Sequence, residues 1–335
     1  MATNVRGLAS EIGAATPTAG SMVPDTKFFQ KVFLKNFYSD ITIGNYGMKY
    51  MVPSNTSNVA VWKYWDDVSA QTTPLTEGVT PTGAALQLNR KEVEIEQYGN
   101  FYTFTDRALD EGIAEAWAYG AEACGQEARL TENQIVYTAL LGGTNAIYSG
   151  TGNSATADIA AGDVLTNANI DSAISTMRKA YAKKINEIAK GSANTGTTPV
   201  NATFAMFVSE DMKDHIETNI TGFKSIETYA ASGGNLHPGE FGAYKEVRFI
   251  ADTDIPVETG AGTGAIDVYN SIILAKDAFG VTFLGPANHE LIKTGLGEAG
   301  SSDPLKQRAT VGWKMRVAAI ILYDLFVTRI ESALV

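Results

Sequence analysis

The stretch TPLTEGVTPTG, from Thr73 to Gly83, and the stretch VEIEQYGNFYTFTD, from Val93 to Asp106, decide the fold of this chain of 335 residues. The first stretch contains two prolines and two glycines, which exclude regular secondary structure. The second lies in an alternating run from Ala85 to Phe104, whose β-branched and aromatic residues predict a strand. A similar run, NVAVWKYWDD from Asn58 to Asp67, precedes the first stretch. Together these segments predict a long β-hairpin with an irregular, extended tip.

This hairpin cannot bury its own apolar side chains. An isolated two-stranded ribbon is marginally stable in water and presents unpaired backbone edges. Either the body of the same chain or a neighbouring subunit must cover it, and periodicity alone favours neither, although the hairpin base is expected to belong to the core. The apolar residues concerned are Val59, Val61, Trp62, Tyr64, Trp65, Val93 and Ile95.

The residues after the hairpin predict one long amphipathic helix, Thr105–Leu141. Thr105 or Asp106 can cap its start, two glycines follow its end, and apolar residues recur every three or four positions along one face. At ~1.5 Å per residue, such a helix is longer than a compact domain needs and is typical of a spine. Cys124 lies on the apolar face, so its thiol is expected to pack in the core rather than react.

The remaining segments mix helix and strand patterns. Residues 1–27 are small and polar and predict a flexible arm, and Phe28–Tyr38 predicts a short amphipathic helix. A second helix is expected over NIDSAISTMRKAYAKKINEIAKG, residues 169–191, with an apolar stripe from Ile170 to Ile188 and Gly191 closing it. NATFAMFV, residues 201–208, is interpreted as a buried strand, and further strands follow in a mostly antiparallel order. The sequence therefore predicts an α+β fold.

The composition allows a large core but indicates an unusual surface. Hydrophobic residues make up 44% of the chain, whereas charged residues reach only 19%, below the roughly 25% of typical soluble proteins. Such a chain suits a surface that neighbours cover, although a lightly charged monomer remains open. The net charge of −11 keeps free subunits soluble and excludes a protein that coats nucleic acid electrostatically. A container can still enclose DNA, because it does not need to grip its contents.

No motif in the sequence supports catalysis, a cofactor or a metal site. The single cysteine, Cys124, excludes a disulfide within the chain and a four-cysteine zinc site. His215, His237 and His289 share no metal-binding spacing and are expected to be surface or capping residues. GAGTGA, residues 260–265, precedes a strand-like run and is interpreted as a hairpin turn rather than a phosphate-binding loop. We therefore expect a protein that is not an enzyme and has no cofactor.

We also expect no membrane partner. The N-terminal residues lack the continuous apolar core of a signal peptide. The longest late apolar run, Val317–Tyr323, is far too short to span a bilayer.

Several segments match a family pattern in the same order. TPLTEGVTPTG and VEIEQYGNFYTFTD are followed by GQEARLTEN (Gly125–Asn133), HPGEFGAYKEVRFIADTDIP (His237–Pro256) and DPLKQRATVGWKM (Asp303–Met315). They resemble a TPL-EGVTP run, a QYG strand with a TD that opens a long helix, a GEQA-like segment, a GEIG region and a DPL…GWK segment. These belong to a family of tailed-phage major capsid proteins typified by the coliphage N-four. The resemblance extends from about Asp25 to Leu334.

The resemblance implies the Johnson fold of tailed-phage and herpesvirus shells. In that fold an extended loop lies across an adjacent subunit, a spine helix supports a peripheral domain, and an axial domain packs around five- and sixfold axes. Lys63 and Lys91 lie in the extended loop, but no motif supports a covalent crosslink between subunits, and we predict none. The implied divisions are residues 1–27 as a flexible N-terminal arm, 28–57 as N-terminal helix and lead-in, 58–99 as the extended loop, 100–168 and 287–335 as the peripheral domain with spine helix 105–141, and 169–286 as the axial domain.

The resemblance implies a structural subunit that self-assembles into the icosahedral head shell around a phage genome. An encapsulin-like compartment that houses a cargo enzyme is the alternative. The expected partners are copies of the chain in hexamers and pentamers, then scaffolding, portal and decoration proteins, with DNA enclosed without sequence-specific binding. The expected location is the virion, after assembly in the host cytoplasm. Candidate contacts between subunits are Trp62, Trp65, Leu75 and Glu77, with Gly78 and Gly83 for the shape of the loop.

Overall fold

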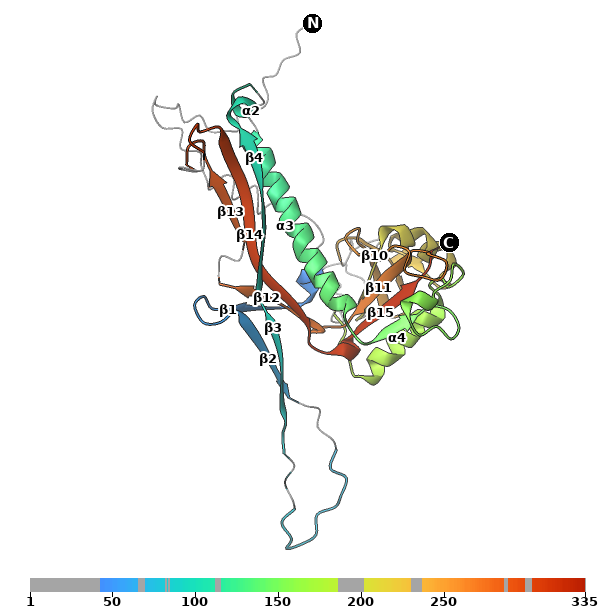
Figure 1. The fold of residues 1–335 in the computed structure, drawn as a ribbon. Coiled ribbons are helices and arrows are strands. Elements are labelled where there is room, and N and C mark those ends of the chain that lie inside the picture. The colour runs from blue at the N-terminus through green and yellow to red at the C-terminus, as the bar shows by residue number, and fades with distance from the viewer. Residues whose placement is uncertain are drawn as a thin grey trace, which may run out of the picture.

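The computed structural model describes most of the chain as two lobes and a projecting hairpin. Figure 1 shows an elongated lobe along helix α3 (Ala116–Leu141), a compact lobe that contains helix α4 (Asn167–Lys179), and a hairpin of strands β2 (Val59–Trp65) and β3 (Leu88–Glu94). The arm and the first helix predicted for residues 1–38 lie outside the described residues. The structure describes residues 43–65, 70–81, 83, 85–111, 116–185, 202–229, 237–285, 289–298 and 303–334.

A five-stranded sheet forms the elongated lobe. Its longest strand, β14 (Arg308–Ile321), pairs along one edge with β12 (Phe279–Leu284) and β13 (His289–Thr294) and along the other with β4 (Glu96–Thr105), while β1 (Met48–Val52) pairs parallel to β12. One face of this sheet packs against α3. Apolar residues alternate along β14 at Val311, Trp313 and Met315, so every second side chain enters the core with Cys124, Ala128 and Val136 of the helix.

An eight-stranded mixed sheet forms the compact lobe. The path runs through β5 (Ala146–Tyr148), β15 (Val327–Ser332), β11 (Val268–Leu274), β6 (Phe204–Val208), β9 (Val247–Ala251), β8 (Glu240–Tyr244) and β7 (Lys224–Ser225), with β10 (Val257–Glu258) beside β11. Helices α4, α5 (Lys213–Asn219) and α6 (Ile226–Tyr229) belong to this lobe, as do the short helices η2 (Thr156–Asp158) and η3 (Glu210–Met212). All five residues of β6 are buried, which confirms the predicted buried strand.

The segment predicted as the second strand of the hairpin, Ala85–Phe104, contains two strands, β3 and β4. β3 pairs antiparallel with β2, whereas β4 pairs with β14 of the elongated lobe. Ile95 lies between β3 and β4 and is 7% exposed, so the chain passes from the hairpin into the lobe through a buried residue. Alternation continues through this point, which is why the division was not visible in the sequence.

The long helix starts later than predicted. Thr105 ends β4, and its hydroxyl accepts a 3.2 Å hydrogen bond from the Ala108 backbone N–H at the start of a short helix, α2 (Asp106–Glu111). The long helix α3 begins at Ala116, and residues 112–115 lie outside the described residues. Gly120 of α3 packs against Phe104, because a Cβ there would lie 2.9 Å from the Phe104 ring. Its absent side chain thus allows close packing.

The second predicted helix ends earlier than expected. α4 ends at Lys179, and residues Ala182–Ile185 continue without helix, so the expected extension to Ile188 and Gly191 is wrong up to Ile185, beyond which the residues are not described. The GAGTGA stretch lies between the antiparallel strands β10 and β11, which confirms a turn. Each lobe also draws on segments distant in sequence: β5 and β15 join the compact lobe, and β12 joins the elongated lobe.

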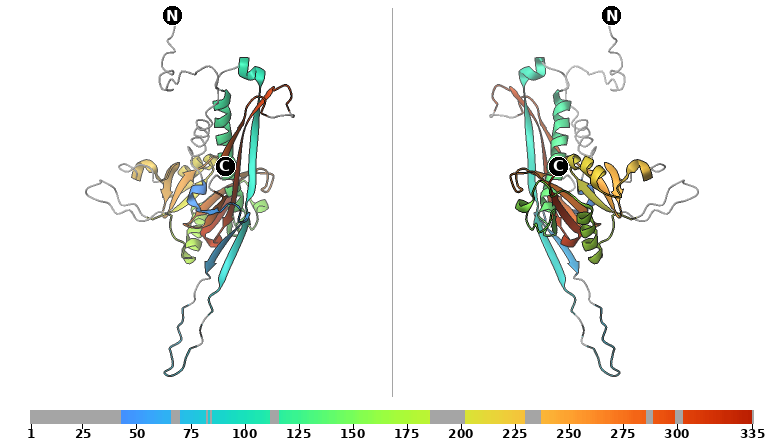
Figure 2. Two further views of the ribbon diagram at one scale, coloured as in Figure 1. Left: turned by 90° about the vertical axis from the view of Figure 1, so that its left-hand side faces the viewer. Right: turned by 90° about the vertical axis from the view of Figure 1, so that its right-hand side faces the viewer.

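One apolar cluster joins the two lobes. It runs from α3 and β14 to Phe207, Ile250 and Ile272 of the compact lobe, with η1 (Ile43–Tyr46) packed beside it. A second cluster lies between the compact sheet and α4 and α5. The hairpin contributes to neither, and Figure 2 shows in both views that it extends away from the lobes.

Candidate assembly interface

One face of the hairpin lies against the body of the same chain. Trp62 Nε1 donates a 3.3 Å hydrogen bond to Thr282 Oγ1 of β12. The indole also covers Gly280, where a Cβ would lie 2.6 Å from the ring. On the neighbouring strand, Lys91 Nζ donates to the Ile321 carbonyl oxygen at 3.1 Å. These contacts fix the hairpin base on the elongated lobe.

A small apolar cluster seals this base. Ala60 of β2 and Ile95 are buried together with Val52 and Ala318, and Val93 and Leu284 pack beside them. The body of the same chain therefore covers the hairpin base, as expected. It does not cover the opposite face of the hairpin.

The opposite face of the hairpin is exposed and carries three large apolar side chains among charged ones, which are Lys63, Arg90, Glu92 and Glu94. Val61 is 38% exposed, Trp65 is 61% exposed and Leu88 is 50% exposed. Trp65 and Leu88 are direct cross-strand partners, so their side chains form one continuous apolar surface. We call Val61, Trp65 and Leu88 the outer row. In the described part of the chain, no core cluster includes the outer row.

Beyond the outer row, the tip of the hairpin also presents apolar side chains. Leu75, Val79 and Leu86 are 76%, 62% and 69% exposed. The Val79 backbone N–H donates to the Thr76 carbonyl oxygen at 3.2 Å, and Gly78 has a φ of 76°. This is a tight turn with Gly78 in the left-handed region, which favours glycine. Glu77 and Gly78 are therefore the two central residues of this turn.

The structure thus separates the six predicted contact residues. Trp65, Leu75, Glu77, Gly78 and Gly83 all lie on the exposed part of the hairpin. Trp62 instead packs against its own chain. Sequence reasoning missed Leu86 and Leu88. Their alternation was visible, but the place of Leu88 opposite Trp65 depends on the register of the hairpin, which the sequence alone leaves undetermined.

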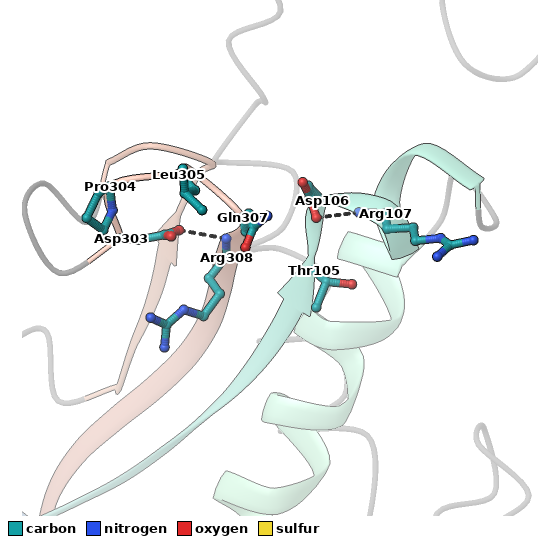
Figure 3. A pocket seen from close by; sticks show the side chains of 8 residues that line it. All are labelled: Thr105, Asp106, Arg107, Asp303, Pro304, Leu305, Gln307 and Arg308. Carbon is teal, nitrogen blue, oxygen red and sulfur yellow. Dashed lines mark hydrogen bonds between the residues drawn. The ribbon is translucent and has the colours of Figure 1, made fainter.

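The far end of the elongated lobe contains a pocket of about 550 Å³. Two carboxylates that line it bind backbone groups of the same chain. Figure 3 shows Asp303 and Asp106 directed at backbone groups rather than at an open site. Asp303 Oδ2 accepts the Arg308 backbone N–H at 2.7 Å, and Asp106 Oδ1 accepts the Arg107 backbone N–H at 2.7 Å. Asp303 therefore fixes the start of β14, and Asp106 fixes the start of α2.

The three histidines are buried, so the prediction of surface or capping roles is wrong. Each is 8% exposed. His289 Nε2 lies 3.3 Å from Glu132 Oε2, His237 Nδ1 lies 3.1 Å from the Tyr46 hydroxyl, and His215 Nε2 lies 3.2 Å from the Leu165 carbonyl oxygen. Burial lowers the pKa of His237. Each ring joins segments distant in sequence, a role that spacing cannot reveal.

Cys124 is the single cysteine of the chain, and its side chain lies in the core. Burial raises the pKa of the Cys124 thiol to about 12, and the residue is fully buried, which confirms its packing role. No three histidine, cysteine or acidic side chains gather as metal ligands in the described ranges. None of the described helices is both long and apolar enough to cross a membrane.

The fold is that of viral shell proteins. The structure is similar to the capsid of Ralstonia phage GP4, with a TM-score of 0.68 and 14% identity over 99% of this chain and 98% of that chain. It is also similar to the capsid of Cyanophage Pam1, with a TM-score of 0.59 and 11% identity over 85% of this chain and 89% of that one. A virus-like particle from Pyrococcus furiosus has a TM-score of 0.50 and 8% identity over 91% and 98%.

Residues 89–330 match the model of a family described as phage capsid protein. The chain belongs to this family and is a structural, shell-forming subunit. No curated protein matches the chain. The encapsulin-like alternative is not favoured, and the narrower group typified by coliphage N-four stays a prediction.

Proposed function

We propose that an adjacent copy of the chain covers the exposed part of the hairpin, and that repetition of this contact closes an icosahedral head shell of hexamers and pentamers. One observation carries the proposal: the outer row and the tip leave large apolar side chains 38–76% exposed on a ribbon two strands wide. A two-stranded ribbon of this kind, with unpaired backbone edges, is marginally stable unless another surface covers it.

Energetics support a partner that is another copy. Full burial of one large apolar side chain contributes about 1.5–3 kcal/mol, so Trp65, Leu75 and Leu88 together offer a substantial driving force. The exposed hairpin extends away from its own lobes, so the surface that covers it belongs to a different part of the neighbouring copy. Head-to-tail contacts of this kind generate closed rings when the rotation between copies closes.

The lobes suggest a division of roles. We assign the elongated lobe with α3 to the peripheral domain, the compact lobe to the axial domain around the five- and sixfold axes, and residues 58–99 to the extended loop. Relative to the limits implied by the sequence, β5 and β15 then belong to the axial domain and β12 to the peripheral domain.

Three further proposals, on catalysis, partners and location, follow from the role of the chain as a shell subunit. We propose that the chain performs no catalysis, that scaffolding, portal and decoration proteins are its further partners, and that assembly takes place in the host cytoplasm before the protein becomes part of the virion. The satisfied buried histidines and the protonated Cys124 thiol support the absence of catalysis.

The test compares variants that remove exposed apolar side chains from the hairpin with a variant that removes one elsewhere on the surface. Trp65→Ser with Leu75→Ser removes apolar side chains from the exposed hairpin, and Leu325→Ser removes one that is 53% exposed on η5 (Asp324–Phe326). Electron microscopy and sedimentation velocity should find folded but unassembled hairpin variants, whereas the control forms shells. Normal shells from the hairpin variant would contradict the proposal.

A further inference from the structure

The turn after α4 ends the helix with an unusual residue. The Tyr181 backbone N–H donates to the Arg178 carbonyl oxygen at 3.1 Å, and the Ala182 N–H donates to the Met177 carbonyl oxygen at 3.0 Å. These two bonds define a Schellman motif, whose left-handed position is normally glycine. Here Tyr181 occupies it, with a φ of 54°.

Tyr181 gains no packing from this strained conformation. Its side chain is 91% exposed, so it is the most exposed large hydrophobic residue in the described chain. A bulky residue in the left-handed region costs roughly 1–3 kcal/mol, and such outliers cluster at functional sites. A solvent-directed aromatic ring that costs stability indicates a contact outside the described chain.

Cationic residues flank Tyr181 in the sequence. The segment RKAYAKK, residues 178–184, carries four cations and no acid in a chain of net charge −11. Lys276 joins them, because its backbone N–H donates to the Lys183 carbonyl oxygen at 2.8 Å. We call Arg178, Lys179, Tyr181, Lys183, Lys184 and Lys276 the basic turn.

Part of this charge is neutralised within the chain. Arg178 and Lys184 both pair with Glu246, at 2.7 and 3.3 Å, and the hydrogen bond from Arg178 lowers the pKa of Glu246. Asp277 is adjacent to Lys276. Lys179, Lys183 and Lys276 are exposed and form no ion pair within the ranges that the structure describes. The basic turn therefore keeps a local positive charge.

We propose that the basic turn contacts the phosphate backbone of enclosed double-stranded nucleic acid, without reading its sequence. Lysines neutralise phosphates, and a tyrosine hydroxyl is among the groups that donate hydrogen bonds to phosphate oxygens. An acidic face of a second copy fits less well, because lysine is depleted from protein–protein interfaces. The turn then faces the interior of the shell. In this way a globally acidic chain holds its genome loosely, through a local basic contact.

The test uses the full-length, unassembled chain and a short DNA duplex of arbitrary sequence, with binding measured by fluorescence anisotropy over a range of salt concentrations. Lys179→Gln, Lys183→Gln and Lys276→Gln together should weaken binding and reduce the slope of log K against log salt by about 2.7, at about 0.9 per lost phosphate contact. Lys49→Gln, Lys224→Gln and Lys306→Gln remove the same charge from exposed positions elsewhere and should leave the slope unchanged.

A second variant separates binding from folding. Tyr181→Gly places the preferred residue in the Schellman position, so its thermal midpoint should rise while its affinity for the duplex falls about threefold to tenfold, the equivalent of one hydrogen bond. A stabilised variant with unchanged affinity would overturn the role of the ring.

The remaining outcomes also decide the proposal. No binding by the unmodified chain at low salt, or equal weakening by both lysine sets, overturns it. Loss of shell assembly in the triple variant without any DNA present would show that the basic turn is an interface between copies, which also overturns it. Failure of the hairpin variants to block assembly would leave this inference standing.

Discussion

The hydroxyl of Tyr137 on α3 donates a 2.6 Å hydrogen bond to Asp252 Oδ2, just after β9, and so joins the long helix to the compact lobe. Two further bonds run parallel to it: Arg129 Nη1 and Asn133 Nδ2 both donate to Asp254 Oδ2, at 2.8 and 2.7 Å. Burial raises the pKa of Asp252 and that of Tyr137. This buried polar contact sets how the two lobes sit on one another.

We expect Tyr137→Phe to lower the free energy of unfolding by about 1–3 kcal/mol, because the Asp252 carboxylate loses a donor while it stays buried. Tyr119→Phe is the matched control on the same helix, since Tyr119 is 63% exposed. Chemical denaturation of the unassembled chain measures both. Equal stabilities for the two variants would contradict the account of the lobe contact.

Stability should also fall at high pH through Tyr46. Burial and the nearby Glu240 raise the pKa of Tyr46 from 10.0 to about 12. Between these values the unfolded chain loses the phenol proton and the folded chain keeps it, so the contribution of Tyr46 is complete below pH 10 and is lost as pH rises to about 12. The slope approaches about 1.4 kcal/mol per pH unit.

Tyr46→Phe removes this titration, so its free energy of unfolding should depend less steeply on pH across that window. Denaturant titrations of the unassembled chain at several alkaline pH values provide the measurement. Tyr50→Phe, at a 43% exposed position, is the control that should keep the steep dependence. An unchanged slope in Tyr46→Phe would count against the role of its burial.

The contact between Trp62 and Gly280 predicts coupling between two substitutions. Gly280→Ala places a methyl group 2.6 Å from the indole and should cost about 1–3 kcal/mol through overpacking. Trp62→Leu makes room for that methyl group, so the double variant should be less destabilised than the sum of the single variants. A double-mutant cycle in denaturant measures the difference, and strict additivity would show that the indole does not hold the hairpin base.

The turn at the hairpin tip predicts that alanine substitution slows assembly at one glycine but not at another, although both glycines lie in open space. A Cβ added at either position would have no atom within 4 Å, but Gly78 has a φ of 76°, whereas Gly83 has no left-handed φ. Gly78→Ala should reduce the population of the native turn about 5–30-fold, the equivalent of roughly 1–2 kcal/mol, and slow assembly. Gly83→Ala should assemble normally. Light scattering compares the rates, and equal rates would mean that the turn shape is unimportant.

Much of the elongated lobe and hairpin was predictable, because it rests on local patterns. Alternation marks β2 and β3, the helical stripe marks α3 and the apolar position of Cys124, and the prolines and glycines mark the tip. The division at Ile95 was not predictable, since it depends on β14, a strand more than two hundred residues later. Sheet membership of β5, β12 and β15 likewise depends on long-range pairing.

The site was predictable in outline only. The sequence shows apolar residues along a ribbon, but which of them face the body depends on the register that pairs Trp65 with Leu88 and on Gly280, which receives Trp62. The end of α4 escaped prediction for a local reason: Tyr181 stands where a glycine is the usual signal. Burial of the histidines depends on partners such as Glu132 and Tyr46, far away in the chain.

The most direct test compares side-chain accessibility before and after assembly. Hydroxyl-radical footprinting with mass spectrometry can measure Trp65, Leu75 and Leu88 in unassembled subunits and in purified shells, with Trp313, which is 4% exposed, as the internal reference. We predict that the three hairpin residues become strongly protected in shells while Trp313 stays unchanged. Equal reactivity of Trp65 and its neighbours in both states would contradict the claim that an adjacent copy covers the hairpin.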